Sequence, residues 1–302
     1  MPKYSSGLTD HALGDRVFRA CALTLLALVI LLIFYPLWTV VVASLSNPME
    51  LYQKTFLFLP TQWTLDSYKM VFRDKDFMMG LANSVFYTVA GTTLNVILNI
   101  CGAYPLSKRR LKGKNTLMFL FTFTMFFSGG MIPTYVLVSR LGLLDTVWAI
   151  LLPSAISMYN IIIMRTYFQT TIPQELEDAA AVDGCTNFRF LLKIVLPLSL
   201  PVVMVVTLYY GVSRWNDYFS AMMYVTHRNL YPLQLVLREI LLQNLAGDML
   251  HTATDAGYAD RMIARMGLKY AVIVISTLPI LIVFPFVQRF FAKGMMIGAV
   301  KG

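Results

Sequence analysis

The sequence has few of the residues that soluble enzymes use for catalysis and surface charge. Only 14% of its 302 residues are charged, and it contains three cysteines and three histidines. These are scattered along the chain and give neither a disulfide framework nor a metal-ligand spacing. The G-x-x-x-x-G-K-[ST], H-E-x-x-H and G-x-S-x-G motifs are also missing. We therefore expect no catalytic residue, no metal site and no cofactor in this chain.

Hydrophobic residues, in contrast, make up 57% of the chain, and the mean hydropathy is +0.64. Several windows contain no charged residue and reach the roughly 18 apolar residues that a helix needs to cross a bilayer. These windows are 20–45, 81–107, 115–139, 146–164, 194–213 and 270–288. The sequence therefore predicts an all-α, polytopic membrane protein with six transmembrane helices.

Positive charge is concentrated at the predicted membrane boundaries, so the net charge of +9 does not indicate nucleic-acid binding. Residues 108–114, KRRLKGK, hold five cations and no acid. Short loops rich in Lys and Arg face the cytoplasm, which places both termini there. The predicted layout is a cytoplasmic segment at 1–19, a transmembrane domain at 20–292 with an extracytoplasmic loop at 214–269, and a cytoplasmic tail at 293–302. No cleavage site follows the first window, so we expect it to be retained.

The windows differ from those of an ion-coupled carrier, because none contains an ionisable group of the kind that proton and sodium carriers use. If the protein transports a solute, the energy must come from a partner. Each window does contain proline, which indicates either ordinary irregularity or bent helices around a path. The prolines are Pro36, Pro105, Pro133, Pro153, Pro197, Pro201, Pro279 and Pro285.

The loop at 214–269 contains an amphipathic pattern after Pro232, with apolar residues spaced for one face of a helix. They are Leu233, Val236, Leu237, Ile240 and Leu241. The pattern predicts a helix outside the membrane. It packs either against the protein's own surface or against the bilayer or a partner.

A polar segment interrupts the chain at 172–201, IPQELEDAAAVDGCTNFRFLLKIVLPLSLP. Its early carboxylates suit the amide end of a helix, and Gly184 can end that helix in the left-handed conformation. One face combines three apolar residues with an acid: Leu176, Ala179, Ala180 and Asp183. A second short helix is expected at 188–194. We predict a short cytoplasmic helix that docks into a groove on a partner.

"EDAAAVDGC" followed by "IVLP" resembles the EAA loop of ATP-binding-cassette (ABC) importer permeases. The resemblance implies a type I importer permease fold, in which the loop at 172–197 forms a coupling helix that contacts an ATP-binding subunit. Asp178 stands at the acidic position, where the family usually has glutamate, and Glu177 beside it is the alternative partner for a base on that subunit. The residues implied in coupling are Glu177, Asp178, Ala179, Ala180, Asp183, Gly184, Ile194, Leu196 and Pro197.

Three further segments resemble the carbohydrate branch of these permeases: "ANSVFYTVAGTTLNVILNICGAYPLSKRRLKGKN", "WNDYFSAMMY" and "KGMMIGAVKG". The resemblance implies half of a heterodimeric sugar importer in a bacterial cell membrane. Its partners would be a second permease, two ATP-binding subunits that hold ATP and Mg, and an extracytoplasmic solute-binding protein. A permease for another solute class is the alternative, and an ion-coupled secondary carrier is a weaker one.

Aromatic and amide side chains in the second and fifth windows could line a sugar path, because sugar rings stack on aromatic faces and their hydroxyls bond at the edges. The candidates are Tyr209, Tyr210, Trp215, Asn216, Asn83 and Asn99. The alternative is an interfacial aromatic belt with hydrogen bonds between helices.

Overall fold

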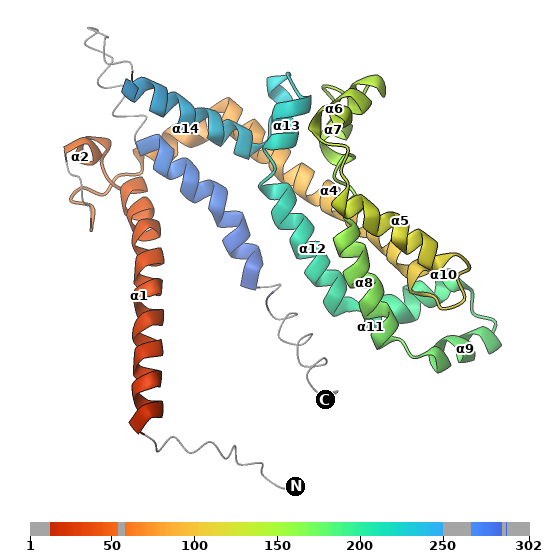
Figure 1. The fold of residues 1–302 in the computed structure, drawn as a ribbon. Helices are drawn as coiled ribbons and strands as arrows, with labels where there is room; N and C mark the ends of the chain where they lie inside the picture. Colours follow the sequence, from red (N-terminus) through yellow and green to blue (C-terminus); the bar gives the residue numbers. More distant parts are fainter. Residues whose placement is uncertain (1–12, 54–57, 250–266, 286–287, 289–302) are drawn as a thin grey trace. The chain divides into compact units, whose positions relative to one another are not determined.

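The computed structural model describes residues 13–53, 58–249, 267–285 and 288. Regular structure in this part is helical, apart from one isolated β-bridge between Ser46 and Trp63 (Figure 1). The labelled helices are α1 (Leu13–Ser44), α2 (Pro48–Gln53), α3 (Asp66–Arg73), α4 (Lys75–Ser107), α5 (Lys114–Phe126), α6 (Met131–Arg140), α7 (Val147–Leu151), α8 (Met158–Thr171), α9 (Gln174–Val182), α10 (Asn187–Phe190), η1 (Leu191–Val195), α11 (Leu196–Leu198), α12 (Leu200–Trp215), α13 (Phe219–Tyr224), η2 (Arg228–Leu230) and α14 (Leu233–Met249). An unlabelled helix, Gly267–Pro285, follows. The predicted all-α class is confirmed.

The chain forms two compact units, residues 1–71 with 247–274 and residues 72–246 with 275–302. In the first unit, α1 is apolar along its length and exposes large side chains such as Leu32, at 76%. Its end is tied down locally, since the Ser44 hydroxyl lies 2.8 Å from that of Tyr68. A helix that exposes so much apolar surface and satisfies its own backbone groups suits hydrocarbon rather than water.

Three described helices are long and apolar enough to cross a membrane by length and composition: Val17–Ser44, Lys75–Ser107 and Gly267–Pro285. Two bent pairs raise that number to five if each pair is one span. The windows at 20–45 and 81–107 therefore correspond to continuous helices, and the window at 270–288 does so up to Pro285. Bends or breaks interrupt the other three.

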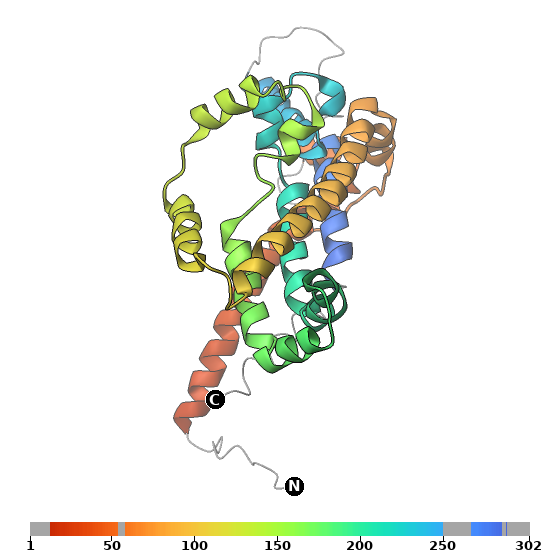
Figure 2. The ribbon, with the colours of Figure 1, turned by 90° about the vertical axis from the view of Figure 1, so that its right-hand side faces the viewer.

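Glycine and proline explain the two bends. The axes of α5 and α6 meet at 110° across Gly129 and Gly130, and Gly130 has a φ of +87° (Figure 2). The helices before and after Ser199 meet at 83°, between Pro197 and Pro201. The π-helical turn η1 precedes Pro197, whose ring crowds the carbonyl four residues earlier. These two windows are therefore bent, but in 115–139 the bend lies at glycines and Pro133 lies inside α6. That bent helices surround a path stays a prediction.

The window at 146–164 is not one helix, so the prediction of a continuous span is wrong there. It contains α7, which has five residues, and the first half of α8. Residues 152–157, which include Pro153, separate them. In contrast, Pro36 and Pro105 lie inside the continuous helices α1 and α4. A proline in a window is therefore not enough to locate a break.

In the second unit, α4, α8 and α12 pack against one another and hold its main core (Figure 1). The Asp74 carboxylate caps α4 by accepting from the backbone N–H of Phe77 at 3.0 Å. Side chains from all three long helices fill the space between them. They include Ala103, Tyr104, Ile161, Met164, Phe168, Val202, Val206 and Tyr210.

The predicted amphipathic helix is α14, and it packs on the protein's own surface. Leu233 is fully buried and Val236 is 4% exposed. The Leu233 N–H donates to Ser84 Oγ at 2.8 Å, and a side chain at Gly80 would meet Val236 at 3.1 Å. Helix α12 continues through Arg214, the first residue of the predicted loop, and Arg214 is buried.

Candidate functional site

The polar segment folds into a short helix, α9, as the sequence predicts. Carboxylates of Glu175 and Glu177 lie in its first turn, where they interact favourably with free backbone N–H groups. Gly184 follows the helix with a φ of +71°, and the Cys185 N–H donates to the Ala180 carbonyl at 2.9 Å. Gly184 therefore ends the helix in the left-handed conformation, as predicted.

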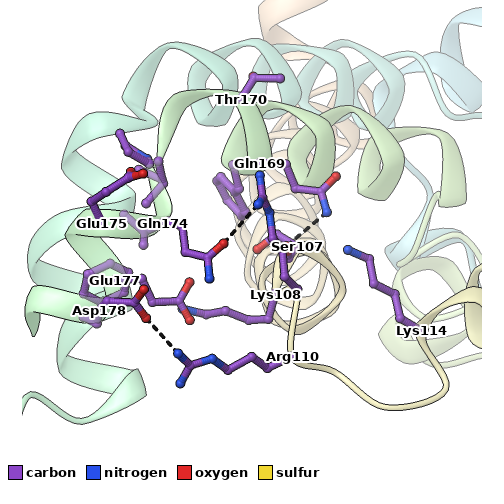
Figure 3. A pocket seen from close by; sticks show the side chains of 16 residues that line it. Ser107, Lys108, Arg110, Lys114, Gln169, Thr170, Gln174, Glu175, Glu177 and Asp178 are labelled. Carbon is purple, nitrogen blue, oxygen red and sulfur yellow. Dashed lines mark hydrogen bonds and ion pairs between the residues drawn. The ribbon is translucent and has the colours of Figure 1, made fainter. Parts of the chain in front are cut away.

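The acids of α9 form ion pairs with the basic segment 108–114 of the same chain. Lys108 Nζ lies 3.0 Å from Glu177 Oε1, and Arg110 Nη2 lies 2.9 Å from Asp178 Oδ1 (Figure 3). Arg109 adds a hydrogen bond of 3.0 Å to Gln174 Oε1. The loop that the positive-inside rule singled out is therefore the intramolecular partner of α9.

The two ion pairs differ in environment. Lys108 is 15% exposed and its ammonium group lies over the rings of Tyr104 and Phe190, at 4.6 and 4.7 Å from their centroids. Arg110 is 76% exposed and Asp178 is 48% exposed. An exposed pair contributes about 0–1 kcal/mol, because water and salt screen it. The Lys108–Glu177 pair is therefore the firmer connection between α9 and the end of α4.

Two cavities flank these ion pairs. One, of about 620 Å³, is polar, and Lys114 points into it (Figure 3). The other, of about 690 Å³, reaches past Gly184 and Cys185. Both cavities are lined by Lys108, Arg110, Glu177, Asp178 and Phe190. The acids of α9 thus lie in a hollowed surface with room for side chains of a second molecule.

The outer face of α9 differs from the predicted one in one residue. Ala180 is 9% exposed and belongs to the core, because α9 rests on the protein through it. Ala179 and Asp183 are exposed, as is Leu176 at 36%. Val182, which the sequence pattern did not single out, is 89% exposed. The face turned away from the chain is therefore formed by Leu176, Ala179, Val182 and Asp183.

The second short helix is also present, with shifted bounds. The Thr186 hydroxyl accepts from the Arg189 N–H and caps α10, which continues into η1 and α11. Ile194 and Leu196 are partly buried against the core, whereas Pro197 is exposed. These three residues therefore belong to the bent connection into α12.

The six candidate sugar-path residues do not form one site. Asn99 Nδ2 donates to the Tyr210 hydroxyl at 2.7 Å, and Trp215 Nε1 donates to the Ser276 carbonyl at 2.9 Å. Asn83 Nδ2 donates to the carbonyls of Asn229 and Tyr231. These bonds join separate parts of the second unit.

The remaining two candidates face outward. Tyr209 is 52% exposed, and the exposed Asn216 donates to the Val212 carbonyl one turn earlier. Of the six candidates, Trp215 lines an apolar cavity of about 400 Å³ between α4, α12 and residues 279–283. The role of the six in a sugar path stays a prediction.

The sequence pattern missed Arg214, which is 5% exposed near the end of α12. Its guanidinium group donates to the carbonyls of Ile150 and Leu151, both at 2.8 Å, and to Asn95 Oδ1 at 3.1 Å. Arg214 stands one residue beyond an uncharged window, which made it look like the start of a loop. All three acceptors are neutral, so the arrangement is not that of a proton relay.

Asp145 joins two turns outside the long helices. Its carboxylate accepts from the Thr226 N–H, the Thr226 hydroxyl and the His227 N–H. These bonds, the Thr226 N–H first, hold the pKa of Asp145 below its usual value. The residue has a φ of +57°, which Asn and Asp tolerate better than most side chains. The carboxylate therefore fixes the turn before α7 to the turn after α13.

Comparison with known proteins gives concordant matches. A family model described as "Binding-protein-dependent transport system inner membrane component" matches residues 7–297. Protein LplC of Bacillus subtilis (strain 168) is 44% identical over 290 residues, which are 96% of this chain and 96% of that protein. The polygalacturonan/rhamnogalacturonan transport system permease protein YtcP of the same organism is 41% identical over 290 residues, or 95% of this chain and 99% of that protein.

A solved structure is also similar. A chain in the crystal structure of a bacterial ABC transporter involved in the import of the acidic polysaccharide alginate matches with a TM-score of 0.83 and 33% identity. The match covers 96% of this chain and 100% of that chain.

Proposed function

Because the chain belongs to the family of binding-protein-dependent transport system inner membrane components, we propose that it forms half of the translocation pathway of an ABC importer for carbohydrates. It is a membrane-located transport subunit rather than an enzyme. Its proposed partners are a second permease, two ATP-binding subunits that hold ATP and Mg, and an extracytoplasmic solute-binding protein. In the proposed orientation both termini and α9 are cytoplasmic.

The observation that carries the proposal is the attachment of α9. A short link through Ile172 and Pro173 joins it directly to α8, and the Lys108–Glu177 pair joins it to the end of α4. Its outer face exposes Leu176 and Val182 on a helix that also contains three acids, Glu175, Glu177 and Asp178. We propose that this face docks into an ATP-binding subunit, so that closure of the ATPase dimer moves α8 and α4.

The attachment also suggests separate roles for the two acids. Glu177 is held beside the half-buried Lys108, whereas Asp178 and its partner Arg110 are far more exposed. An exposed pair exchanges partners at little energetic cost. We therefore assign Asp178 to contact with a basic residue of the ATP-binding subunit, and Glu177 to holding α9 on its own chain.

The substrate we propose is an oligosaccharide from an acidic polysaccharide. Two matched proteins carry such substrates in their descriptions, polygalacturonan/rhamnogalacturonan in one case and alginate in the other.

The test is uptake in proteoliposomes that contain the assembled importer, with oligogalacturonates compared with neutral maltooligosaccharides. We expect uptake of the acidic sugar that requires both ATP and the binding protein. Uptake driven by an ion gradient without the ATP-binding subunits would overturn the proposal in favour of a carrier. ATP-dependent uptake of amino acids or peptides alone would overturn the carbohydrate assignment.

Crosslinking tests the docking face. The three native cysteines, Cys21, Cys101 and Cys185, are first replaced by serine. A cysteine at Val182 should then crosslink to the ATP-binding subunit, whereas one at Phe219, beyond the far end of α12, should not. Crosslinking from both positions or from neither would contradict docking through α9.

A further inference from the structure

The break between α7 and α8 lies inside a predicted membrane span and leaves backbone groups without helical partners. Helix α7 ends at Leu151, and α8 begins after Ser157, so the last carbonyls of α7 and the first N–H groups of α8 need other bonds. In a membrane interior, each unsatisfied group costs several kcal/mol. The hydrogen bonds that satisfy these backbone groups therefore strongly constrain how α7 and α8 are held in span four.

Two residues of α12, one helical turn apart, satisfy both sides of the break. On the α7 side, Arg214 donates to the carbonyls of Ile150 and Leu151, both at 2.8 Å. On the α8 side, the N–H of Ser157 donates to the Tyr210 hydroxyl at 2.9 Å. Residues four apart on a helix lie on the same face. A single face of α12 therefore bridges the interruption.

Two residues of α4, also one turn apart, complete the arrangement. Asn95 Oδ1 accepts from Arg214 at 3.1 Å, and Asn99 Nδ2 donates to the Tyr210 hydroxyl at 2.7 Å. Both asparagines are fully buried, and Tyr210 is 6% exposed. A Cβ at Gly91, one turn before Asn95, would lie 3.1 Å from Arg214 Nε. The surface of α4 is thus shaped to receive the arginine.

We propose that Asn95, Asn99, Tyr210 and Arg214 form a polar latch that fixes the hinge of span four. This inference rests on the proposed function. Helix α8 runs from the latch to α9 through two residues, so the latch sets the angle at which movement of α9 enters the membrane domain. The four are positioning residues for coupling, and none needs to touch the sugar.

The latch can exchange partners. Within the described part of the chain, Asn95 Nδ2 and Asn99 Oδ1 are buried and have no hydrogen-bond partner. One is a donor and the other an acceptor, so a shift of α8 or α12 can form new bonds as others break. No carboxylate of a described residue forms an ion pair with Arg214, and bonds to neutral carbonyls are easier to exchange than a buried ion pair. A hinge that transmits movement between two sites needs hydrogen bonds with two alternative arrangements, and the latch can provide them.

The test compares two tyrosines that each lose one buried hydroxyl. Tyr210→Phe removes the centre of the latch. Tyr87→Phe is the matched control. Tyr87 is 2% exposed and its ring packs in the cluster that contains Ile150 and Leu151, but its hydroxyl donates to the Leu230 carbonyl at 2.9 Å and to no residue of the latch. The purified importer in nanodiscs or proteoliposomes is assayed for assembly, ATP hydrolysis and sugar molecules transported per ATP.

We expect Tyr210→Phe to assemble normally and to lower the number of sugars transported per ATP by about tenfold or more, because Asn99 Nδ2 and the Ser157 N–H both lose their acceptor. Tyr87→Phe should leave that ratio unchanged. Arg214→Lys, which keeps the charge but loses the fork that reaches two carbonyls, should resemble Tyr210→Phe.

The other outcomes overturn the inference. Equal ratios in Tyr210→Phe and Tyr87→Phe would make the latch an ordinary set of packing bonds. Failure of both Tyr210→Phe and Arg214→Lys to assemble, while Tyr87→Phe assembles, would assign the four residues to folding alone. A wild-type importer without ATP-driven sugar uptake would instead refute the proposed function itself, which separates the two failures.

Discussion

The protein uses arginine in two contrasting ways, at the latch around the break of span four and at the surface beside α9. Arg214 is 5% exposed and bonds to neutral acceptors on two other helices, whereas Arg110 is 76% exposed and pairs with the Asp178 carboxylate. Removing the buried group leaves carbonyls unsatisfied in a dry interior, but water replaces the exposed group. The buried contacts therefore contribute more to stability than the exposed contacts, which water replaces at little cost.

The largest expected effect is that of Arg214→Leu. It leaves Ile150 O, Leu151 O and Asn95 Oδ1 without their donor and should destabilise the protein by about 3 kcal/mol or more, because each buried acceptor left unsatisfied costs about 1–3 kcal/mol. Thermal unfolding of the detergent-purified subunit, with Arg110→Leu as the matched exposed variant, measures the difference. Equal losses of stability would contradict the contrast between buried and exposed arginine.

Gly91→Ala should have the next largest effect, about 1–3 kcal/mol from overpacking. The new methyl would lie 3.1 Å from Arg214 Nε and 3.1 Å from Leu151 Cδ2, both within the latch region. Gly102→Ala meets only the flexible end of Ile161 and serves as the control. Unfolding midpoints and sugars per ATP should both fall for Gly91→Ala; a larger fall for Gly102→Ala would show that the glycine does not serve the latch.

Gly184→Val should cost about 1–2 kcal/mol at the end of α9, because a branched residue is strained at a φ of +71°. No atom lies within 4 Å of a Cβ placed there, so the effect is conformational rather than steric within this chain. Gly184→Asn, which tolerates that conformation, should keep more uptake than Gly184→Val at equal membrane abundance. Equal uptake in both variants would show that the backbone conformation at the end of α9 does not affect transport.

The ion pairs of α9 should show smaller effects, below about 1 kcal/mol for the exposed one. Double-mutant cycles of Lys108→Met with Glu177→Gln, and of Arg110→Met with Asp178→Asn, measure the coupling energies. We expect a larger energy for the first cycle, because Lys108 is 15% exposed and lies over two rings. In 0.5 M salt the coupling energy between Arg110 and Asp178 should fall to zero before that between Lys108 and Glu177. The opposite order would reverse the roles given to the two acids.

The smallest effect is the pH dependence of Asp145. Its pKa is lowered in the folded protein, so its contribution to stability is present above the usual value of 3.8 and is lost as the pH falls through the lower folded pKa. Asp145→Asn, which keeps the tolerated backbone conformation, should therefore reduce the unfolding midpoint at pH 7 and converge with wild type as the pH falls below the folded pKa of Asp145. A constant difference across this range would show that the carboxylate charge has no part.

The apolar helices and α9 could be predicted from the sequence, because they depend on local composition and on the spacing of residues. Uncharged windows indicated the apolar helices, and Gly184 and the acids before it indicated α9. The break after α7 could not be found in the same way, since Pro153 looks no different from Pro36, which lies within a continuous helix. Only packing against α4 and α12 decides which proline interrupts a span.

The candidate functional residues show the same limit. Asp178 and Glu177 were recognisable because a motif surrounds them, but their intramolecular partners depend on the fold that brings segment 108–114 beside α9. Arg214 was missed because a charge next to an apolar window normally marks the end of a span. Its burial depends on Gly91 and Asn95, which lie more than a hundred residues earlier.

In the proposed coupling, the short link at Ile172 and Pro173 makes α8 a lever arm that pivots at the break. Helix α8 has 14 residues, so it is about 21 Å long, and a tilt of about 10° at one end displaces the other by about 4 Å. A stroke of a few ångströms at α9 therefore reaches the break as a small angular change. A modest force applied at α9 is therefore enough to exchange hydrogen-bond partners at the buried end of α8.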